Sequence, residues 1–379
     1  MGHIKPKNNN NALLPNPHSL IPCGEAALVN VKMDLSSLLP EELRLWSQEQ
    51  GFPAYRGDQI FHWLHQRGVA DFSEMTNLPQ DFRRFLQENA SLKYPKILKR
   101  QEAAANDTVK LLLELDDGEQ VEMVLMLYAR QQSKNRATCC VSSQTGCPIG
   151  CAFCATAWAG PGRNLLPGEM TAQVILAGQE AKKLGFEQIT NVVYMGMGEP
   201  LLNLAALRQS IAILNHPQGL NIGMRKITIS TCGLTPQIYQ IADWGWPLGL
   251  ALSLHAADEG LRKSLIPAAK TNSLQSLLAA CSSYREKTGQ RVTYEYALFA
   301  GINDSIKAAH ALGRLLAGHD ALLNIIPANS VKKTGFFAPK GEIIKVFIEI
   351  LSGYNLEVQL REPRGQDIDA ACGQLRIRN

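Results

Sequence analysis

Three cysteines within eight residues carry the strongest chemical signal in the chain. They form the motif Cys147-Pro-Ile-Gly-Cys151-Ala-Phe-Cys154, which has a Cys-x3-Cys-x2-Cys spacing. A loop of this length can direct three thiolates to three irons of a [4Fe–4S] cluster, and the fourth iron then stays open to another ligand. Structural zinc, the alternative, usually takes four ligands from two separated pairs, and no second pair follows here. The spacing therefore favours a cluster with one open iron.

The composition is that of an ordinary globular chain, long enough for one large domain and a small one. Of its 379 residues, 45% are hydrophobic and 19% are charged, and the net charge of +4 is compatible with nucleic acid without being diagnostic of it. The nine cysteines are too scattered for a disulfide scaffold, which indicates a reducing, cytoplasmic compartment. No apolar run approaches the roughly 18 residues of a transmembrane helix, so we expect no membrane association.

The N-terminal part is predicted to hold a tail and a small helical unit. Residues 1–33 lack both periodicity and a signal-peptide core, so we expect a disordered tail. Residues 34–95 contain three short amphipathic patterns that start near Pro40, Asp58 and Leu78. The basic and histidine side chains of these helices fit a solvated face and an RNA-binding surface equally well.

A β-hairpin linker is predicted over residues 96–132. Two apolar strands, at 108–115 and 120–128, are joined by the turn sequence Asp116-Asp117-Gly118-Glu119. Glu122 lies early in the second strand, and alternation alone favours the solvent face of the hairpin for its carboxylate.

Residues 133–367 show repeated strand–loop–helix units, which predict an α/β fold. Six short apolar strands with helices between them favour a parallel sheet with right-handed crossovers, as in a partial (β/α)6 barrel. A doubly wound sheet is the competing topology. A further helix (342–351) and strand (356–360) follow. The six strands are expected at 137–141, 189–195, 226–230, 248–254, 292–298 and 322–326.

Polar and glycine-rich groups follow the predicted strands. Taken singly, each is typical of a turn or a cap. Together they fit an extended small-molecule ligand, because the carboxyl ends of parallel strands meet at one edge of a sheet. The groups are Ser142–Gln144 after the first strand, Gly196–Pro200 after the second, Ser230–Gly233 at the end of the third, Ser253–His255 at the end of the fourth, and Pro327–Asn329 near the end of the sixth.

Two more cysteines lie outside the triplet. Cys140 belongs to the first barrel strand, and alternation puts it on the face opposite to its neighbour Cys139. Cys372 lies in the segment 368–379, in an acidic, glycine-containing stretch where a thiol could be exposed. An isolated cysteine is more often a small buried hydrophobe, so neither position indicates chemistry by itself.

Taken together, these motifs resemble the radical S-adenosylmethionine (SAM) superfamily. More narrowly, the chain resembles the RlmN/Cfr family, the adenosine C2 methyltransferases of 23S rRNA and tRNA. The similarity runs from about residue 37 to the C-terminal segment. The stretches that carry it are Tyr55–Phe61, Glu74–Pro79, Cys140–Cys147, Gly196–Asn203, Ile229–Gly233, Ser253–Ala256 and Asp367–Leu375.

The resemblance implies a radical SAM barrel with an N-terminal RNA-binding helical unit, a [4Fe–4S] cluster and SAM. It implies that Cys147, Cys151 and Cys154 hold the cluster. It further implies that SAM contacts seven of the strand-end residues: Gly198, Glu199, Ser230, Ser253, Leu254, His255 and Asn329. The implied partners are 23S rRNA, tRNA and an electron donor such as flavodoxin, and the implied state is a cytoplasmic monomer.

The resemblance also implies roles for three residues outside the cluster motif. Cys372 receives a methyl group from one SAM molecule. A 5′-deoxyadenosyl radical from a second SAM activates that methyl, which then adds to the adenine ring. Glu122 corresponds to the general base that removes the ring proton. Cys140 corresponds to the thiol that forms a transient disulfide with Cys372 and releases the product.

This sequence departs from the family pattern at three places. The interval between Glu122 and Cys140 is about five residues longer, around residues 130–135. Cys139 is an extra thiol beside Cys140, and the stretch Thr156–Arg163 after the cluster motif is unusual. Three other functions stay open at this point: a C8-specific adenosine methyltransferase of the same family, a radical SAM enzyme with another substrate, and a non-catalytic RNA-binding protein stabilised by zinc or a cluster.

Overall fold

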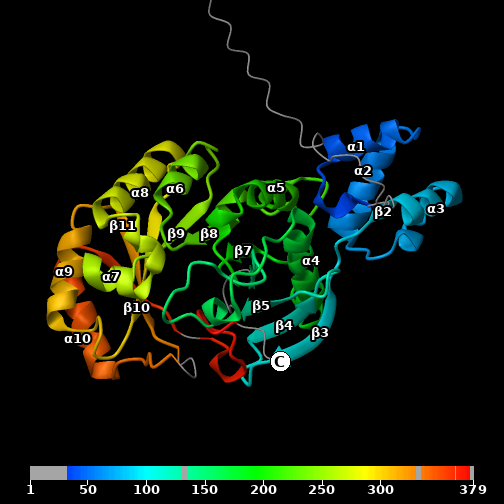
Figure 1. Cartoon of the computed structure of the whole chain (residues 1–379). Coiled ribbons are helices and arrows are strands. Elements are labelled where there is room, and N and C mark those ends of the chain that lie inside the picture. Colours follow the sequence, from blue (N-terminus) through cyan, green and yellow to red (C-terminus); the bar gives the residue numbers. More distant parts are fainter. Residues whose placement is uncertain (1–31, 130–134, 330–333, 363, 376–379) are drawn as a thin grey trace, which may run out of the picture.

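The computed structural model describes residues 32–129, 135–329, 334–362 and 364–375. Within them, ten strands form one continuous sheet in the order β12-β11-β10-β9-β8-β7-β6-β5-β4-β3 (Figure 1). The strands are β3 (Lys96–Glu102), β4 (Thr108–Glu114), β5 (Gln120–Tyr128), β6 (Arg136–Cys140), β7 (Asn191–Tyr194), β8 (Ile227–Thr231), β9 (Gly249–Ser253), β10 (Val292–Leu298), β11 (Ala321–Pro327) and β12 (Glu357–Leu360).

The parallel part of the sheet is a partial barrel. From β6 to β12, every strand pairs in parallel with the next strand of the sequence. A doubly wound sheet reverses its strand order at a switch point, and this order does not reverse. The predicted α/β partial barrel is therefore confirmed.

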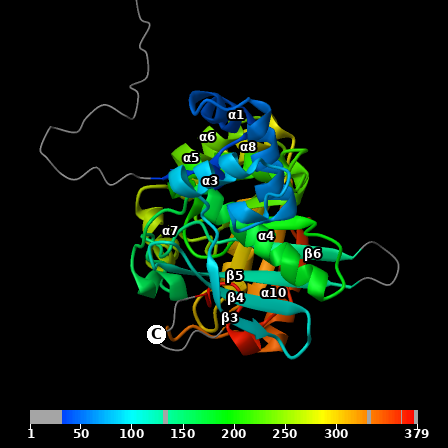
Figure 2. The ribbon, with the colours of Figure 1, turned by 90° about the vertical axis from the view of Figure 1, so that its right-hand side faces the viewer.

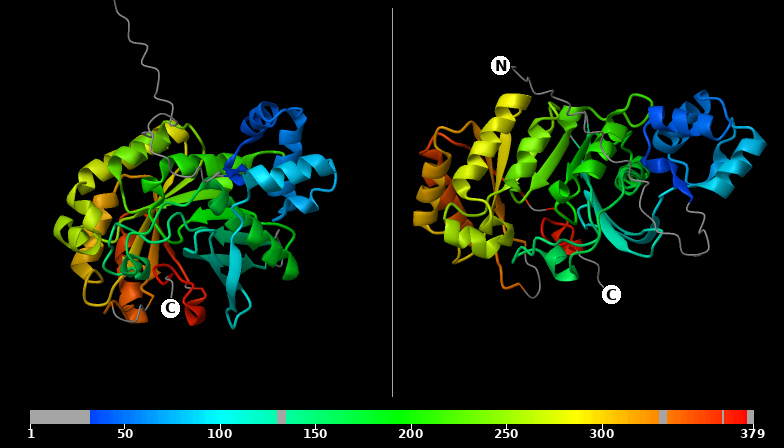
Figure 3. Two further views of the ribbon diagram at one scale, coloured as in Figure 1. Left: turned by 45° about the vertical axis from the view of Figure 1, so that its right-hand side comes forward. Right: turned by 45° about the horizontal axis from the view of Figure 1, so that its top comes forward.

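Helices α4 to α10 surround this sheet as an outer rim (Figures 1 and 3). Of these, α7 was not predicted from the sequence, because seven residues are too few to show a helical period. In the described part of the chain, no helix has the length and apolar character needed to span a bilayer. The helices are α4 (Pro167–Lys183), α5 (Leu204–Asn215), α6 (Thr235–Ala242), α7 (Glu259–Leu265), α8 (Leu274–Thr288), α9 (Ile306–Leu316) and α10 (Gly341–Ser352).

Strand β10 illustrates how alternation divides core from cavity. Tyr294 and Tyr296 are buried on the outer face of the strand, and the Tyr296 ring lies 5.6 Å from Phe347 of α10. The residues that alternate with them along the strand, Glu295 and Ala297, line the cavity inside the barrel. The same period of two therefore fixes both the helix packing and the polar interior.

The predicted hairpin belongs to the main sheet. Strands β4 and β5 pair antiparallel, and β5 pairs antiparallel with β6, so the hairpin extends the barrel edge. Strand β3 was not predicted. It reads Lys-Ile-Leu-Lys-Arg-Gln-Glu and is mostly exposed, so it lacks the apolar alternation that marks a half-buried strand. A charged outer strand of this kind protects a sheet edge from further pairing.

The N-terminal helices form a separate apolar core beside the barrel (Figure 2). They are α1 (Pro40–Glu49), α2 (Tyr55–His62), which continues as a π-helical turn to Arg67, and α3 (Gln80–Asn89). A short pair, β1 (Met33–Asp34) and β2 (Ala90–Ser91), closes the unit. Ser37 joins it to the barrel, since its Oγ accepts from Gly168 N–H at 2.8 Å. The predicted tail, 1–33, lies outside the described residues except for its last two.

The exposure of two leucines on α1 gives a matched test of this core. Leu43 is fully buried, whereas Leu45 on the same helix is 62% exposed. We expect Leu43→Ala to lower the free energy of unfolding by about 2–5 kcal/mol, because it leaves a cavity. We expect Leu45→Ala to change it by less than about 0.5 kcal/mol. Denaturant unfolding of both variants measures the difference, and equal losses would contradict the packing described.

Candidate active site

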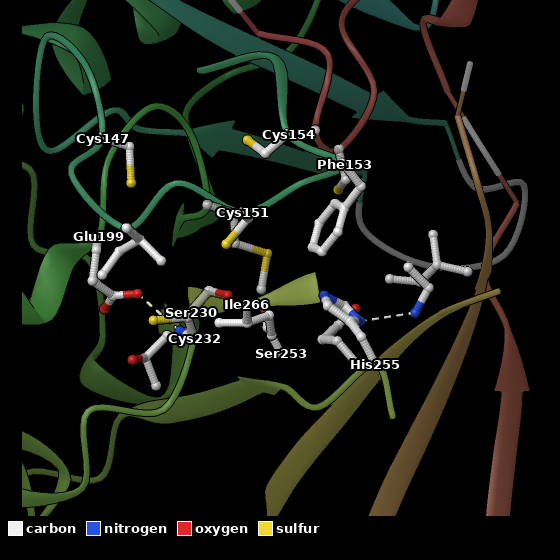
Figure 4. A pocket seen from close by; sticks show the side chains of 18 of the residues that line it. Cys147, Cys151, Phe153, Cys154, Glu199, Ser230, Cys232, Ser253, His255 and Ile266 are labelled. Atoms are coloured by element: carbon white, nitrogen blue, oxygen red, sulfur yellow. Dashed lines mark hydrogen bonds between the residues drawn. The ribbon is translucent and has the colours of Figure 1, made fainter. Parts of the chain in front are cut away.

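A cavity opens at the carboxyl ends of strands β7 to β11 (Figure 4). The three motif cysteines line it, together with six of the seven predicted strand-end residues: Gly198, Glu199, Ser230, Ser253, His255 and Asn329. Leu254 is the exception, because its side chain is fully buried in the apolar core. The parallel register thus collects at one place residues that are up to 182 positions apart, from Cys147 to Asn329.

The cluster motif forms a loop held by backbone hydrogen bonds at both ends. Cys147 N–H donates to Gly160 O at 2.9 Å, and Ala152 N–H donates to Leu265 O of α7 at 3.0 Å. In Figure 4 the thiols of Cys147, Cys151 and Cys154 point into the same part of the cavity. The loop is therefore shaped by contacts with its own continuation and with α7.

The arrangement of the three thiols fits a cluster better than a single ion. Among the described residues, no three histidine, cysteine or carboxylate groups converge closely enough to bind one metal ion. A [4Fe–4S] cluster does not need such convergence, because each thiolate binds a different iron. Cys147, Cys151 and Cys154 would hold the cluster, which would supply one-electron chemistry at this cavity.

The unusual stretch after the motif closes the loop. Gly146 and Gly162 are in such close contact that a Cβ on Gly162 would lie 2.2 Å from Gly146 N, and Gly162 has a φ of +60°. Arg163, the next residue, holds the contact between Gly146 and Gly162 in place, since its guanidinium binds the buried carboxylate of Glu169 at 2.8 Å and that of Asp117 at 2.5 Å. The stretch Thr156–Arg163 therefore frames the cluster loop.

Glu199 presents a buried carboxylate fixed by backbone donors. Its Oε2 accepts from Cys232 N–H at 2.8 Å, and its Oε1 accepts from Leu201 N–H at 3.1 Å. Burial raises the pKa of this carboxyl, while the backbone donors oppose the rise. The preceding Gly198 has a φ of +101°, and a Cβ there would lie 2.6 Å from the Gln144 side chain. Only glycine lets the chain deliver Glu199 here.

His255 is a neutral, oriented imidazole. Ala297 N–H donates to its Nδ1 at 2.9 Å, so the ring proton resides on Nε2. Burial lowers the pKa of His255 to about 3. The ring meets Phe153 of the cluster loop edge-on, with 5.0 Å between centroids. His255 thus offers a hydrogen-bond donor at all physiological pH values without adding charge.

A second cavity adjoins the first and contains the other two predicted thiols. Cys140 and Cys372 both line it, and the two cavities share Cys154, Asn329, Arg361 and Cys372. Burial raises the pKa of Cys140 to about 12, and the nearby sulfur of Cys372 adds to the rise. Cys139 lies on the opposite face of β6, with its Sγ 3.9 Å from Gln173 O of α4. The structure therefore brings Cys140, and not Cys139, close to Cys372.

The segment that carries Cys372 is anchored on two sides. Ala155 N–H, directly after the last cluster cysteine, donates to Gly373 O at 2.7 Å, and Thr156 Oγ1 donates to Leu375 O at 2.7 Å. On the other side, Asn329 Nδ2 donates to Cys372 O at 3.1 Å. Figures 1 and 3 show this red segment between the cyan β-strands and the barrel. Cys372 itself stays exposed.

Glu122 is buried, and the expectation from alternation that it faces solvent is wrong. Only 5% of the residue is exposed, and its Oε1 lies 2.9 Å from Lys110 Nζ. Lys110 Nζ also donates to Asp369 O at 3.2 Å, so the C-terminal segment covers this face of the hairpin. Because Val124 pairs directly with Cys140, Glu122 belongs to the same face of the sheet as Cys140. The insertion between them, residues 130–134, lies outside the described residues.

Several residues of the site carry no signal in the sequence. Arg361 lines both cavities, and its guanidinium lies 3.5 Å from the buried carboxylate of Glu295. The nearby sulfur of Cys372 raises the pKa of Arg361. Asn303 is fully buried, and its Nδ2 donates to His255 O at 2.9 Å. Arg262 is also fully buried beneath the strand ends. Each acts through three-dimensional contacts with residues distant in sequence, so no local motif identifies it.

Known proteins are similar to this chain over nearly its whole length. Residues 141–312 match the radical SAM superfamily, and residues 33–92 match the ribosomal RNA large subunit methyltransferase N-terminal domain. The probable dual-specificity RNA methyltransferase RlmN of Heliobacterium modesticaldum is 44% identical, over 90% of this chain and 89% of that protein. Its counterpart in Moorella thermoacetica is also 44% identical, over 92% of this chain and 98% of that protein.

A solved structure shares the fold. The crystal structure of a radical SAM methyltransferase from Sphaerobacter thermophilus superposes with a TM-score of 0.87 and is 41% identical in sequence. The match covers 91% of this chain and 99% of that one. The helical unit, the hairpin extension and the barrel therefore occur together, in the same arrangement, in that structure.

The exposure of the thiols predicts their order of alkylation. Cys372 is exposed, whereas Cys139, Cys140 and Cys281 are buried. With iodoacetamide at pH 8, we expect Cys372 to react at least tenfold faster than Cys140, since burial and a raised pKa keep Cys140 a protected thiol. Peptide mass spectrometry of the cluster-loaded protein measures the rates, with Cys281 as the internal control. Faster labelling of Cys140 would contradict the described position of the C-terminal segment.

Proposed function

Because the chain belongs to the RlmN family of radical SAM methyltransferases, we propose that it methylates carbon 2 of adenosine in 23S rRNA and in tRNA. One observation carries the proposal: Cys372 borders both the cavity of the cluster loop and the cavity of Cys140. This position suits a thiol that first receives a methyl group near bound SAM and is later attacked by a second thiol. The relatives are named as dual-specificity RNA methyltransferases, which supports two kinds of RNA substrate, and the match of residues 33–92 to a ribosomal RNA large subunit methyltransferase domain supports rRNA as one of them.

The chemistry explains why such an apparatus is needed. Carbon 2 of adenine has no lone pair and no acidic proton, so direct displacement from SAM has no nucleophile to use. When bound, the [4Fe–4S] cluster and SAM supply the one-electron chemistry that activates a methyl group for addition to the ring. The residues of this chain bind the reactants, transfer protons, and form and break bonds to sulfur.

Cys372, Glu122 and Cys140 act in sequence. The thiolate of Cys372 accepts the methyl of one SAM molecule. That carbon would lose one hydrogen atom to the one-electron chemistry that the cluster and SAM supply, and it then becomes bonded to the adenine ring. Glu122 removes the proton from carbon 2. Cys140 then attacks the Cys372 sulfur, which forms an S–S bond and breaks the S–C bond. The released carbon takes up a proton to become the methyl group, and the disulfide is reduced before the next turnover.

Positioning falls to the groups around the first cavity. Gly198, Glu199, Ser230, Ser253, His255 and Asn329 hold SAM, and Leu254 contributes backbone only. Residues 34–95 bind RNA beside the barrel as a unit, residues 96–132 link it, residues 133–367 form the radical SAM core, and residues 368–379 carry Cys372. The target base must leave its stack, at a cost of about a few kcal/mol that is smallest in loops. This favours an adenosine of the peptidyl-transferase centre and the one next to the anticodon.

Two accompanying conditions belong to the same proposal. Cluster chemistry and free thiols require a reducing compartment, so the protein acts in the cytoplasm. It acts there as a monomer. An electron donor such as flavodoxin reduces the cluster.

The position of the new methyl group tests the regiochemistry. We expect nucleosides from RNA treated with the reconstituted protein to contain 2-methyladenosine, because the proposed chemistry adds the methyl group at carbon 2. Digestion and mass spectrometry against both synthetic standards measure it, on 23S rRNA fragments and on tRNA. The appearance of 8-methyladenosine instead would assign the chain to the C8-specific branch and overturn the proposal.

Removal of Cys140 tests the thiol roles. We expect Cys140→Ala to accumulate a covalent protein–RNA adduct through Cys372, because nothing then breaks the S–C bond, and to lose product by at least 100-fold. A gel shift that survives denaturation, with peptide mapping of Cys372, measures it. Cys139→Ala is the matched control, since the neighbouring thiol faces the core and should keep full turnover. Full methylation by Cys140→Ala without an adduct would refute these roles.

A further inference from the structure

Arg262 of α7 is a fully buried cation bound only to backbone. Its Nη2 donates to Cys232 O at 2.6 Å and to Ser253 O at 3.3 Å, and its Nε donates to Leu254 O at 3.2 Å. None of its surface is exposed. All three acceptors are at or just beyond the carboxyl ends of β8 and β9, where the first cavity begins. One guanidinium therefore ties two strand ends of the site together.

The charge of Arg262 has no carboxylate counterpart at hydrogen-bond distance. Its buried Nη1 has no hydrogen-bond partner within the described part of the chain. Glu259 of the same helix acts on the guanidinium only through space, since its Oε1 accepts from Leu274 N–H and its Oε2 lies 3.8 Å from Lys263 Nζ. A buried charge is costly unless anions lie close to it. A further anion near Arg262 would therefore stabilise it.

The cluster loop is the neighbour that would supply this anion. Leu265 O, at the end of the same helix α7, accepts from Ala152 N–H between two of the cluster cysteines. Leu265 and Ile266 pack in one apolar group with Cys151 and Phe153, and Figure 4 shows Ile266 at the wall of the cavity. Cys232, whose backbone oxygen accepts from the guanidinium at 2.6 Å, belongs to the same apolar group as Cys151.

A fixed cation at this place has a defined effect on the cluster. A [4Fe–4S] cluster with three thiolate ligands is anionic, and reduction adds one more negative charge. Nearby positive charge in a poorly solvated site favours the more negative form, so it raises the reduction potential. Arginine suits the task better than lysine, because its planar fork can satisfy several carbonyl oxygens and still keep its charge.

We propose that Arg262 raises the reduction potential of the cluster and positions the strand ends that flank it. The proposal rests on the radical SAM cluster and does not depend on which RNA or which carbon is methylated. Arg262 touches neither substrate nor SAM in this role, so it is a positioning residue that acts through charge and backbone contacts.

The test is a redox titration of the reconstituted full chain without RNA. Electron paramagnetic resonance follows the reduced cluster of the wild type, Arg262→Gln, Arg262→Lys and Arg285→Gln. We expect Arg262→Gln to lower the equilibrium constant for reduction at least tenfold, which corresponds to about 59 mV for one electron. We expect Arg262→Lys to stay within about threefold of the wild type. Arg285→Gln changes an exposed residue on α8 and is the control, so its cluster should have the reduction potential of the wild type.

The outcomes separate charge from shape. An unchanged potential in Arg262→Gln with full iron content overturns the proposal, and so does an equal shift in Arg262→Lys. If Arg262→Gln does not retain iron, Arg262→Met provides a second neutral variant of similar length. Loss of iron in both neutral variants, with retention in Arg262→Lys, supports a requirement for charge; loss in all three overturns it. Because no RNA is present, failure here is independent of failure of the proposed methylation.

Discussion

The pairing of β5 with β6 is the constraint on which the site depends. This antiparallel register continues the parallel barrel sheet into the hairpin, and it sets Val124 of β5 opposite Cys140 of β6. A slip of one residue between the two strands would put Glu122 and Cys140 on opposite faces of the sheet. The pairing therefore joins two halves of the chemistry that belong to different topologies: the cluster loop comes from the parallel barrel, and the carboxylate comes from the antiparallel extension.

Buried charges around the cavities are held by different kinds of partner. Glu199 is fixed by backbone N–H groups, Arg262 by backbone carbonyls, and Glu122 by the ammonium of Lys110. Backbone partners cannot move away or exchange protons, so they give Glu199 and Arg262 permanent positions. Lys110 is a side chain that also binds the C-terminal segment at Asp369 O. The environment of Glu122 therefore depends on the position of this segment.

The sequence was sufficient where chemistry followed a local pattern. The cysteine spacing, the polar groups after the strands and the alternation of Cys139 and Cys140 all predicted placements that the structure has. Local patterns failed for Glu122, because the C-terminal segment that buries it is more than 240 residues away in the chain, at Asp369. They failed for β3, whose charges resemble those of a loop, and for Leu254, whose neighbours face the cavity while it faces the core. Arg262 gave no signal, since its partners are backbone atoms.

The two hydrogen bonds from Ala155 and Thr156 to the C-terminal segment have a consequence for how the two cavities are coupled. They make the residues directly after Cys154 the support on which Cys372 rests. The backbone that ends the cysteine loop is therefore the same backbone that fixes the height of Cys372 between the two cavities. A substitution in Ala155–Ala159 that shifts this turn would displace the Cys154 and Cys372 sulfurs together.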